Sequence, residues 1–360
     1  MKKTQFARLA FEQTTNYVLQ EASLWSGRCF CKPTSINIDI TSRCNCRCMQ
    51  CDIWKKDVDS ELTTEQYKEI FSKLRKWMGK FNLTIGGGEP FMRKDLVELI
   101  AFASKNGILT NVLTNGILIN EKIVSHLEQS GLNRIAISLD GFTPETNDLT
   151  RGIKGAFEKT LKAVDLLSGM KSGPLVTVST IIMKTNLNDL VEMAKWVDIK
   201  GINGILFQPL NANFAAEYKH DWYNTNELWI DNYNDVCRVL DELVEMKRGG
   251  TRIINSIKQL EDMKTYFKNP NAPTEKRKCK VGMQNFCIAP NGDVQLCYQM
   301  NAIGNVVRDT PINVWNSEKA KQLRKIIKFC KRPCSILNCN YSGGFREKVA
   351  KFASYIVKLK

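Results

Sequence analysis

The stretch TSRCNCRCMQC, residues 41–51, places Cys44, Cys46, Cys48 and Cys51 close together in the sequence. A zinc ion held by four cysteines usually takes two CxxC pairs set far apart, and this stretch contains a single CxxC pair, Cys48 to Cys51. An iron–sulfur cluster is larger, and three thiolates at the spacing Cys44-x3-Cys48-x2-Cys51 can wrap it and leave one iron open. We therefore expect an iron–sulfur cluster on these three cysteines, with Cys46 left over.

The composition is that of an ordinary globular protein, with 43% hydrophobic and 25% charged residues among 360. No apolar run approaches the roughly 20 residues that cross a bilayer, and the N-terminus lacks the apolar core of a signal peptide. We predict a cytoplasmic protein, in which 13 cysteines serve more often as metal ligands or catalytic groups than as disulfides. The net charge is +15, but no RNA-binding motif stands out, so we expect no nucleic-acid partner.

From residue 35 onward, short apolar runs alternate with amphipathic stretches, which predicts strands alternating with helices around a parallel sheet. The most unusual motifs follow the strands directly, where α/β folds place their chemistry. These motifs are the cysteine stretch, GGGEP (86–90), TNG (114–116) and SLDG (138–141). The expected strands are 35–40, 81–87, 108–116, 134–141, 175–182 and 202–210, and the expected helices are 63–78, 94–107, 120–131, 156–168, 186–201 and 226–247.

Taken together, CxxxCxxC, GGGEP, LTNG and SLDG resemble the radical S-adenosylmethionine (SAM) enzymes over residues 35–215. The resemblance implies a partial (β/α)6 TIM-like barrel and a [4Fe–4S] cluster on Cys44, Cys48 and Cys51 whose open iron binds SAM. Reductive cleavage of SAM would give a 5′-deoxyadenosyl radical that takes hydrogen from a substrate, chemistry that the cofactor supplies and the protein positions. The residues that the resemblance assigns to SAM are Gly87, Gly88, Glu89, Ser138, Asp140 and Arg151.

Alternatives remain for some of these residues. Ser138 and Asp140 also suit a strand end followed by a turn, and Arg151 also suits a surface salt bridge. The glycines would let the backbone approach the ligand closely, and Glu89 would brace the turn.

The C-terminal part holds a second group of cysteines. In CKVGMQNFCIAPNGDVQLC (279–297), Asn291-Gly292 predicts a hairpin, and a helix is expected over 312–327. This part resembles the SPASM/twitch extension of radical SAM enzymes, a small α+β domain with auxiliary iron–sulfur clusters, although a full SPASM domain uses seven cysteines. The resemblance implies one auxiliary [4Fe–4S] cluster on Cys279, Cys297, Cys330 and Cys334, with Cys339 as a replacement or further ligand.

A structural zinc on the same cysteines is the rival for this second site. Cys287 and Cys237 are expected in the core, and the pair Cys29 and Cys31 is given a structural role. The expected domains are an N-terminal extension (1–34), the barrel (35–215), a helix and linker (216–278), the auxiliary-cluster domain (279–344) and a basic amphipathic helix (345–360). We expect this last helix to dock on the protein core, with peripheral membrane contact as the alternative.

The resemblance implies an oxidoreductase or maturase that oxidises or cross-links a peptide or small molecule with help from the auxiliary cluster. It also implies an electron donor of the flavodoxin or ferredoxin type, and a peptide substrate would need a separate recognition protein. The alternative is a non-catalytic iron–sulfur or zinc protein that binds a macromolecule. No catalytic residue is assigned: neither His126 nor His220 ends a strand, so any base is a carboxylate, an auxiliary-cluster ligand or solvent.

Overall fold

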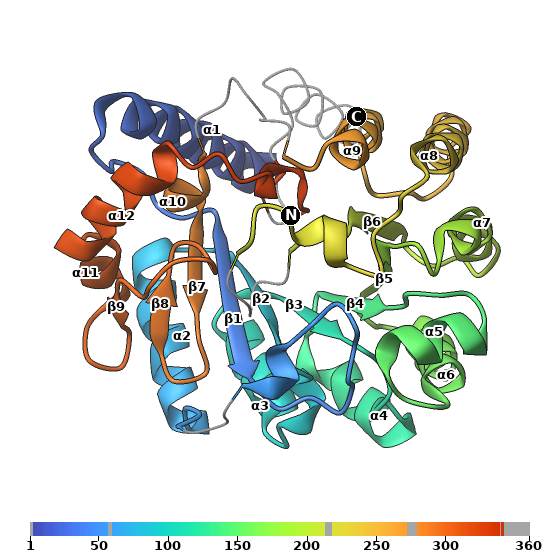
Figure 1. The fold of residues 1–360 in the computed structure, drawn as a ribbon. Coiled ribbons are helices and arrows are strands. Elements are labelled where there is room, and N and C mark those ends of the chain that lie inside the picture. Colours follow the sequence, from blue (N-terminus) through green and yellow to red (C-terminus); the bar gives the residue numbers. More distant parts are fainter. Residues whose placement is uncertain (1–2, 57–59, 213–217, 272–278, 339, 342–360) are drawn as a thin grey trace.

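A computed structural model describes residues 3–56, 60–212, 218–271, 279–338 and 340–341, with the backbone alone for 3–14. All six expected strands form, each paired in parallel with the next, and Figure 1 shows them as one curved sheet with helices along its outer side. The predicted α/β fold with its partial barrel is confirmed. The strands are β1 (Ser35–Thr41), β2 (Asn82–Gly87), β3 (Leu109–Thr114), β4 (Arg134–Ser138), β5 (Leu175–Ile182) and β6 (Ile205–Pro209).

The helices that cover the sheet begin where the sequence supplies a cap. Thr63 forms a capping box with Gln66 at the start of the first of them, which satisfies backbone N–H groups that a helix start leaves open. Asn120 accepts a hydrogen bond from the backbone of Ile123 in the same way. The outer helices are α2 (Thr64–Met78), α3 (Leu96–Lys105), α4 (Glu121–Ser130), α6 (Ala156–Ser168), α7 (Leu190–Ile199), α8 (Tyr233–Arg248) and α9 (Ile257–Lys268).

Side chains alternate across β1 and define the two faces of the sheet. Ile36, Ile38 and Ile40 are at most 1% exposed and belong to the main core. Asn37 and Asp39 lie between them and are only half-buried. Because successive residues of a strand point to opposite faces, these two polar side chains lie on the inner face, away from the isoleucines.

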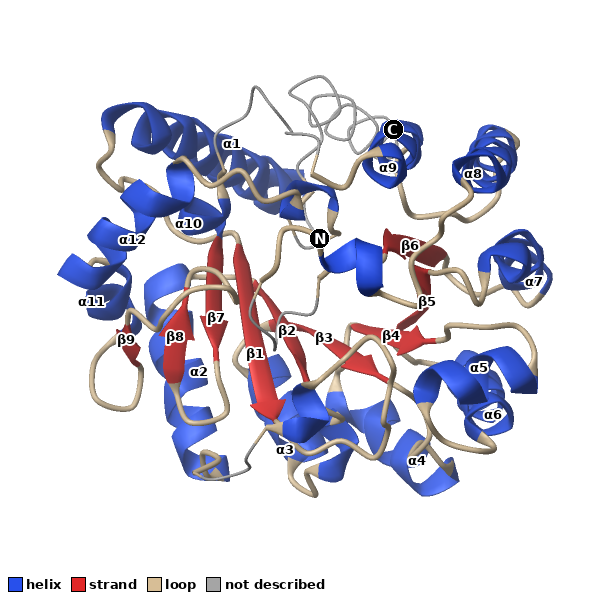
Figure 2. Ribbon diagram, viewed as in Figure 1, coloured by secondary structure: helices blue, strands red, loops and turns tan. Residues whose placement is uncertain are grey.

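The C-terminal strands extend the same sheet. β7 (Asn285–Ile288) pairs in parallel with β1, and β8 (Asp293–Gln295) and β9 (Gly304–Asn305) follow in antiparallel order. Figure 2 shows β7 beside β1. The strand order is β6-β5-β4-β3-β2-β1-β7-β8-β9. The predicted hairpin is present, with Gly292 at a φ of +86°. The auxiliary cysteines therefore enter beside the strand that leads to Cys44.

One predicted helix begins later than the sequence indicated. The expected helix over 226–247 starts at Tyr233, where Asn232 caps it. Leu228, Trp229 and Ile230 are all buried in succession, which a helix with one apolar face does not allow. The region beyond this helix, expected to be linker, contains α9.

Other helices also depart from the expectation. The helix predicted over 312–327 is two helices, α11 (Pro311–Trp315) and α12 (Glu318–Lys328), because Ser317 caps a new start. Among the described residues, four α-helices had no counterpart in the sequence analysis: α1 (Lys3–Ser26), α5 (Pro144–Arg151), α9 and α10 (Val281–Gln284). The helix expected over 345–360 lies outside the described residues. In the described part of the chain, no helix has both the length and the apolar character needed to cross a membrane.

Phe286 on β7 is fully buried between two tryptophans, with ring centroids 5.7 Å from Trp77 and 6.1 Å from Trp315. Phe286→Ala should lower the free energy of unfolding by about 3 to 5 kcal/mol, because it removes a large core side chain and leaves a cavity. Ile199→Ala, at a side chain that is 84% exposed, should change it by less than about 0.5 kcal/mol. Urea unfolding followed by circular dichroism measures both. Equal effects would contradict the packing described for β7.

Candidate functional site

The cysteine loop that follows β1 is fastened to the last turn of α5. The backbone N–H of Arg47 donates to the carbonyl of Arg151 (2.9 Å), and that of Met49 donates to the carbonyl of Thr150 (3.0 Å). The Arg47 guanidinium also donates to the carbonyl of Cys44 (2.9 Å). The loop is therefore positioned by the protein backbone.

The four thiols of this loop fall into two environments. Cys44, Cys48 and Cys51 are half-buried, whereas Cys46 is 1% exposed. A hydrogen bond from Cys46 is the main cause that lowers the pKa of Cys44 and Cys48, the latter to about 6, and it raises the pKa of Cys46 itself. Burial raises the pKa of Cys51. The three cysteines of the CxxxCxxC spacing are thus the accessible ones, and Cys46 occupies the position of a small core residue.

The GGGEP segment packs against the chain just before Cys44. The N–H of Gly88 donates to the carbonyl of Thr41 (2.8 Å), and the N–H of Glu89 donates to the carbonyl of Arg43 (2.8 Å). A Cβ at Gly87, whose φ is +110°, would collide with the Thr41 carbonyl oxygen, and a Cβ at Gly88 would collide with that of Arg43. The sequence suggested that these glycines admit a ligand, whereas the close approach in the structure is to the protein's own backbone.

Glu89 is fully buried and connects three segments. It accepts hydrogen bonds from the Thr114 hydroxyl (2.7 Å), the Asn115 N–H (2.8 Å) and the Phe91 N–H (3.1 Å). Burial raises its pKa, and these hydrogen bonds oppose the rise. The Asn115 side chain then donates to the side chain of Asn45 inside the cysteine loop (2.7 Å). Sequence reasoning singled out TNG but missed this contact with Asn45.

Arg151 and Asp140 form a buried ion pair beside the cysteines. Their nitrogen and oxygen are 2.7 Å apart, and both residues are at most 8% exposed, so the surface salt bridge considered for Arg151 is not what forms. Arg151 Nη1 also lies 3.8 Å from the sulfur of Cys48. Asp140 accepts hydrogen bonds from the Gln50 side chain (2.9 Å) and the Ile181 N–H (2.8 Å). Both of its oxygens are therefore engaged within the protein, and its contact with a SAM ribose stays a prediction.

The residues present fit the group that the sequence implied. Three accessible thiols stand beside a buried guanidinium, and Arg151 Nε has no hydrogen-bond partner among the described residues. A buried charged donor without a partner is costly, and an anionic ligand such as the SAM carboxylate would satisfy it. Ser138 lies half-buried at the end of β4. The assignment of these residues to the cluster and SAM remains a prediction.

Asp39 is a polar residue of the inner face that the sequence analysis did not single out. Burial raises its pKa to about 6, against the effects of Lys56 and of a hydrogen bond from Tyr298. The Tyr298 hydroxyl donates to Asp39 Oδ1 at 3.4 Å. Tyr298 directly follows Cys297, so this contact joins β1 to the auxiliary cysteine group. The polar–apolar alternation of SINIDI (35–40) was the signal that could have identified Asp39.

The auxiliary cysteines Cys279, Cys297 and Cys330 lie within electrostatic range of one another. Burial raises the pKa of Cys279 to about 11, and the charges of Cys330 and Cys297 add to the rise. Cys334 and Cys330 both act on Tyr218, whose pKa is raised first by burial and then by these two cysteines. Cys339 lies outside the described residues. Cys287 is buried in β7, where the Asn37 side chain donates to its sulfur (3.6 Å).

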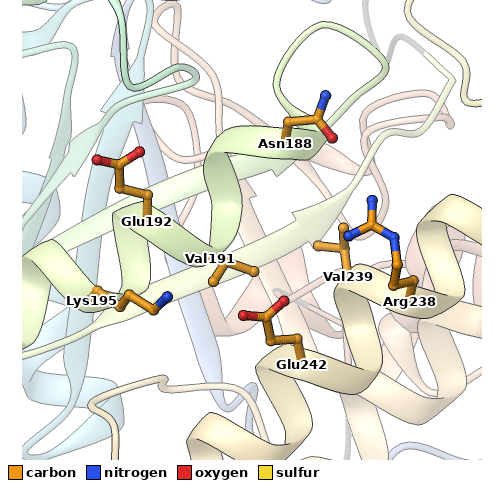
Figure 3. A pocket seen from close by; sticks show the side chains of 7 residues that line it. All are labelled: Asn188, Val191, Glu192, Lys195, Arg238, Val239 and Glu242. Carbon is orange, nitrogen blue, oxygen red and sulfur yellow. The ribbon is translucent and has the colours of Figure 1, made fainter.

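The cavity in Figure 3, about 420 Å³ in volume, lies elsewhere. It is lined by residues of α7 and α8 and of the turn before α7, in the outer helix layer, whereas the cysteine loop follows β1. Its charged residues are Glu192, Lys195, Arg238 and Glu242. Acidic and basic groups are mixed there, and none of them belongs to the site described above.

Comparison with known proteins identifies two family models in this chain. One, the radical SAM superfamily, matches residues 38–197, and the other, SPASM, an iron–sulfur cluster-binding domain, matches residues 279–340. An AdoMet-dependent heme synthase of Methanosarcina barkeri is 33% identical over 312 residues, which cover 81% of this chain and 85% of that protein. An Fe-coproporphyrin III synthase of the same organism is 36% identical over 174 residues, which cover 48% of this chain and 43% of that protein.

A solved structure shows the same fold. Streptococcus suis SuiB bound to the precursor peptide SuiA aligns with a TM-score of 0.66 and 15% sequence identity, over 91% of this chain and 77% of that one.

Two neighbouring glycines allow a matched test of the backbone contact before Cys44. Gly88→Ala should displace residues 42–43, because its Cβ would lie 2.7 Å from the Arg43 carbonyl carbon, and iron bound per chain should fall by at least half. Gly86→Ala is the control, because its Cβ would meet only the Leu113 side chain at 3.5 Å. Iron content after anaerobic reconstitution measures the effect. Full iron loading of Gly88→Ala would show that this contact does not position the cysteine loop.

Proposed function

Because this chain belongs to the radical SAM superfamily and carries an iron–sulfur SPASM domain, we propose that it oxidises or cross-links a peptide or small molecule on the inner face of its sheet. It is an enzyme, and its cofactors are SAM, a [4Fe–4S] cluster and auxiliary iron–sulfur clusters. The non-catalytic alternative is not retained. We assign the first cluster to Cys44, Cys48 and Cys51, and one auxiliary cluster to Cys279, Cys297, Cys330 and Cys334, with Cys339 as the alternative ligand.

The observation that carries this proposal is the hydrogen bond between Tyr298 and Asp39. Asp39 lies on β1 opposite Gly86 in the strand register, next to the GGGEP segment. Tyr298 follows Cys297, an auxiliary cysteine. The pair therefore lies on the inner face of the sheet between the two cysteine groups. A substrate bound at this position would be near both of them.

When bound, the cluster and SAM supply the abstraction of a hydrogen atom from the substrate. The protein's part is to bind and orient. Arg151 holds a positive charge beside Cys48, suited to an anionic group, and Glu89 and Asn115 hold the cysteine loop in place through Asn45. An oxidation that starts with hydrogen abstraction must also release an electron, which the auxiliary cluster would accept, and a proton. Asp39 is our candidate acceptor, because its pKa of about 6 is close to the operating pH of a general base.

We favour a peptide as the substrate over a small molecule. The observation that favours a peptide is that SuiB, whose fold this chain shares, was solved with a precursor peptide. The small-molecule alternative is supported by the relative from Methanosarcina barkeri that is named an AdoMet-dependent heme synthase. We place the enzyme in the cytoplasm, where a flavodoxin or ferredoxin would supply the electrons. Membrane contact through residues 345–360 is the remaining alternative for that segment.

Cysteine substitutions test the reaction. Cys44→Ala, Cys48→Ala and Cys51→Ala should each abolish formation of 5′-deoxyadenosine from SAM under anaerobic, reducing conditions, because each removes a cluster ligand. Cys46→Ala is the matched control and should retain activity, because Cys46 is 1% exposed and lies outside the CxxxCxxC spacing. Chromatography of the nucleoside products measures the outcome. Equal loss in Cys46→Ala would overturn the choice of ligands.

The same proteins report the number of clusters. Wild type should bind about eight irons per chain, four for each cubane, and a triple variant at Cys44, Cys48 and Cys51 should keep about four. Zinc without iron in the triple variant would refute the auxiliary cluster, and about twelve irons in wild type would indicate a full SPASM domain.

Asp39→Asn should separate radical formation from product formation. Amide replacement removes the proton acceptor but keeps an oxygen for Tyr298, so SAM cleavage should stay within a few-fold of wild type. Product from a candidate precursor peptide should fall by about 10²-fold or more. Asp231→Asn, at a residue that pairs with Lys184 on the surface, is the control and should leave both rates unchanged. A fall in SAM cleavage as large as the fall in product would argue that Asp39 acts on the cofactor site.

Asp39→Asn should also change how stability depends on pH. The folded protein holds the Asp39 proton up to about pH 6, whereas the unfolded chain releases it near pH 4. Wild type should therefore lose stability as pH rises between these values, by up to about 3 kcal/mol, and the variant should lose less. Thermal unfolding at pH 4 and pH 7 measures the difference. A variant whose stability relative to wild type is the same at both values would contradict the raised pKa.

A further inference from the structure

The segment that joins α1 to β1 carries two cysteines that neither cluster uses. The sulfurs of Cys29 and Cys31 lie 4.0 Å apart. Cys29 is half-buried, whereas Cys31 is 5% exposed and its sulfur lies within hydrogen-bond distance of the Ser23 hydroxyl (3.8 Å) and the Met283 carbonyl (3.7 Å). One thiol is therefore open to a reagent, and the other lies behind it.

A buried guanidinium lies within electrostatic range of this pair. Arg324 on α12 is 4% exposed and stacks on Trp315, with 4.2 Å from its guanidinium carbon to the ring centroid. Arg324 Nε donates to the Gly282 carbonyl (2.9 Å) and Nη2 to the Trp315 carbonyl (2.8 Å). Nη1 has no hydrogen-bond partner within the part of the chain that the structure describes. A buried charge in this position requires an anionic partner.

The two cysteines supply that negative charge. Among the described residues, Cys29 and Cys31 are the acidic groups that raise the pKa of Arg324 against the lowering effect of burial. The pKa of Cys29 is lowered to about 6, first by a hydrogen bond from Cys31 and further by the charge of Arg324, while burial opposes the change. The pKa of Cys31 is raised, first by its hydrogen bond to Cys29. These shifts favour the thiolate on Cys29 and the proton on Cys31.

This arrangement does not suit a metal ion. A guanidinium near the thiols repels a cation, and two thiols are fewer than the three or four protein ligands that a zinc site takes. It suits nucleophilic thiol chemistry, because a thiolate beside a positive charge is the reactive form of cysteine.

We propose that Cys29 and Cys31 are a dithiol redox site, in which Cys29 is the nucleophilic thiolate paired with Arg324 and Cys31 is the resolving thiol. The oxidant is a small-molecule disulfide. The Cys29 thiolate attacks one of its sulfurs, forms a mixed disulfide and releases a thiolate. Cys31 then gives up its proton and attacks Cys29, which forms the Cys29–Cys31 disulfide and releases the second half of the oxidant as a thiol. The two cysteines lose two electrons, and the oxidant gains them.

Oxidation would remove the negative charge that faces Arg324. Trp315, on which Arg324 stacks, donates from Nε1 to the carbonyl of Cys31 (3.0 Å). α12 itself runs to Lys328, just before the auxiliary ligand Cys330. A change in the redox state of this pair would therefore change the surroundings of Arg324 on α12, the helix that precedes the auxiliary cysteines.

The first test is the pH profile of Cys29 alkylation in the cluster-loaded wild-type enzyme. A short anaerobic pulse of iodoacetamide, followed by peptide mass spectrometry, gives the rate at each pH. The rate should reach half its maximum near pH 6. A midpoint above about pH 8, the range of an ordinary thiol, would overturn the proposal without any variant.

Variants of α12 test the ion pair. Arg324→Gln should raise the midpoint for Cys29 by about 1 to 3 pH units, the range expected on loss of an adjacent opposite charge. Arg324→Lys should restore part of the shift. Lys325→Gln, at the exposed neighbour, is the matched control and should leave the midpoint unchanged. If Arg324→Gln loads its clusters normally and keeps the wild-type midpoint, Arg324 does not pair with Cys29.

Oxidised glutathione tests the disulfide itself. Incubation of the loaded enzyme should give a peptide with an internal Cys29–Cys31 bond, and Cys31→Ser should stop at the glutathione adduct on Cys29. Dithiothreitol should restore both thiols. If wild type accumulates the adduct on Cys29 and never the internal disulfide, Cys31 is not a resolving thiol and the redox site is refuted.

Discussion

Two backbone hydrogen bonds, from Gly88 to Thr41 and from Glu89 to Arg43, hold the cysteine loop against the second strand. They require a backbone without Cβ atoms at Gly87 and Gly88, since either side chain would collide with a carbonyl oxygen of the segment before Cys44. The loop has no regular secondary structure over most of its length. Its geometry therefore depends on its neighbours: GGGEP on one side and the last turn of α5 on the other.

The charged side chains buried near this contact have hydrogen-bond or ion-pair partners within the protein. Glu89 is satisfied by backbone and hydroxyl donors, and Arg151 pairs with Asp140 and lies beside the sulfur of Cys48. Among the described residues, Asp39 accepts a hydrogen bond from Tyr298, and burial raises its pKa. The two carboxyl groups thus differ in their surroundings. Glu89 connects three segments, whereas Asp39 is the proton acceptor that we propose.

The strands and most outer helices were predictable because their signals are local. Alternating apolar residues mark β1, and the side chains of Thr63 and Asn120 mark helix starts. The start of α8 could not be predicted, because the residues before it are buried by contacts that are distant in the sequence. Trp229 packs against Tyr266 and Phe267 of α9. The site followed the same rule. CxxxCxxC and GGGEP could be found by spacing, but the pairing of Asp39 with Tyr298 joins residues 259 positions apart, and no local pattern encodes it.

The pairing of β1 with β7 has a consequence for how the chain is made. Ile36 lies opposite Phe286 in the strand register, so 250 residues must be synthesised before one edge of β1 finds its partner. At bacterial or eukaryotic translation speeds this takes roughly 10 to 50 seconds. Until then, the edge of β1 that pairs with β7 is without its partner strand, and an unpaired strand edge can pair with other chains.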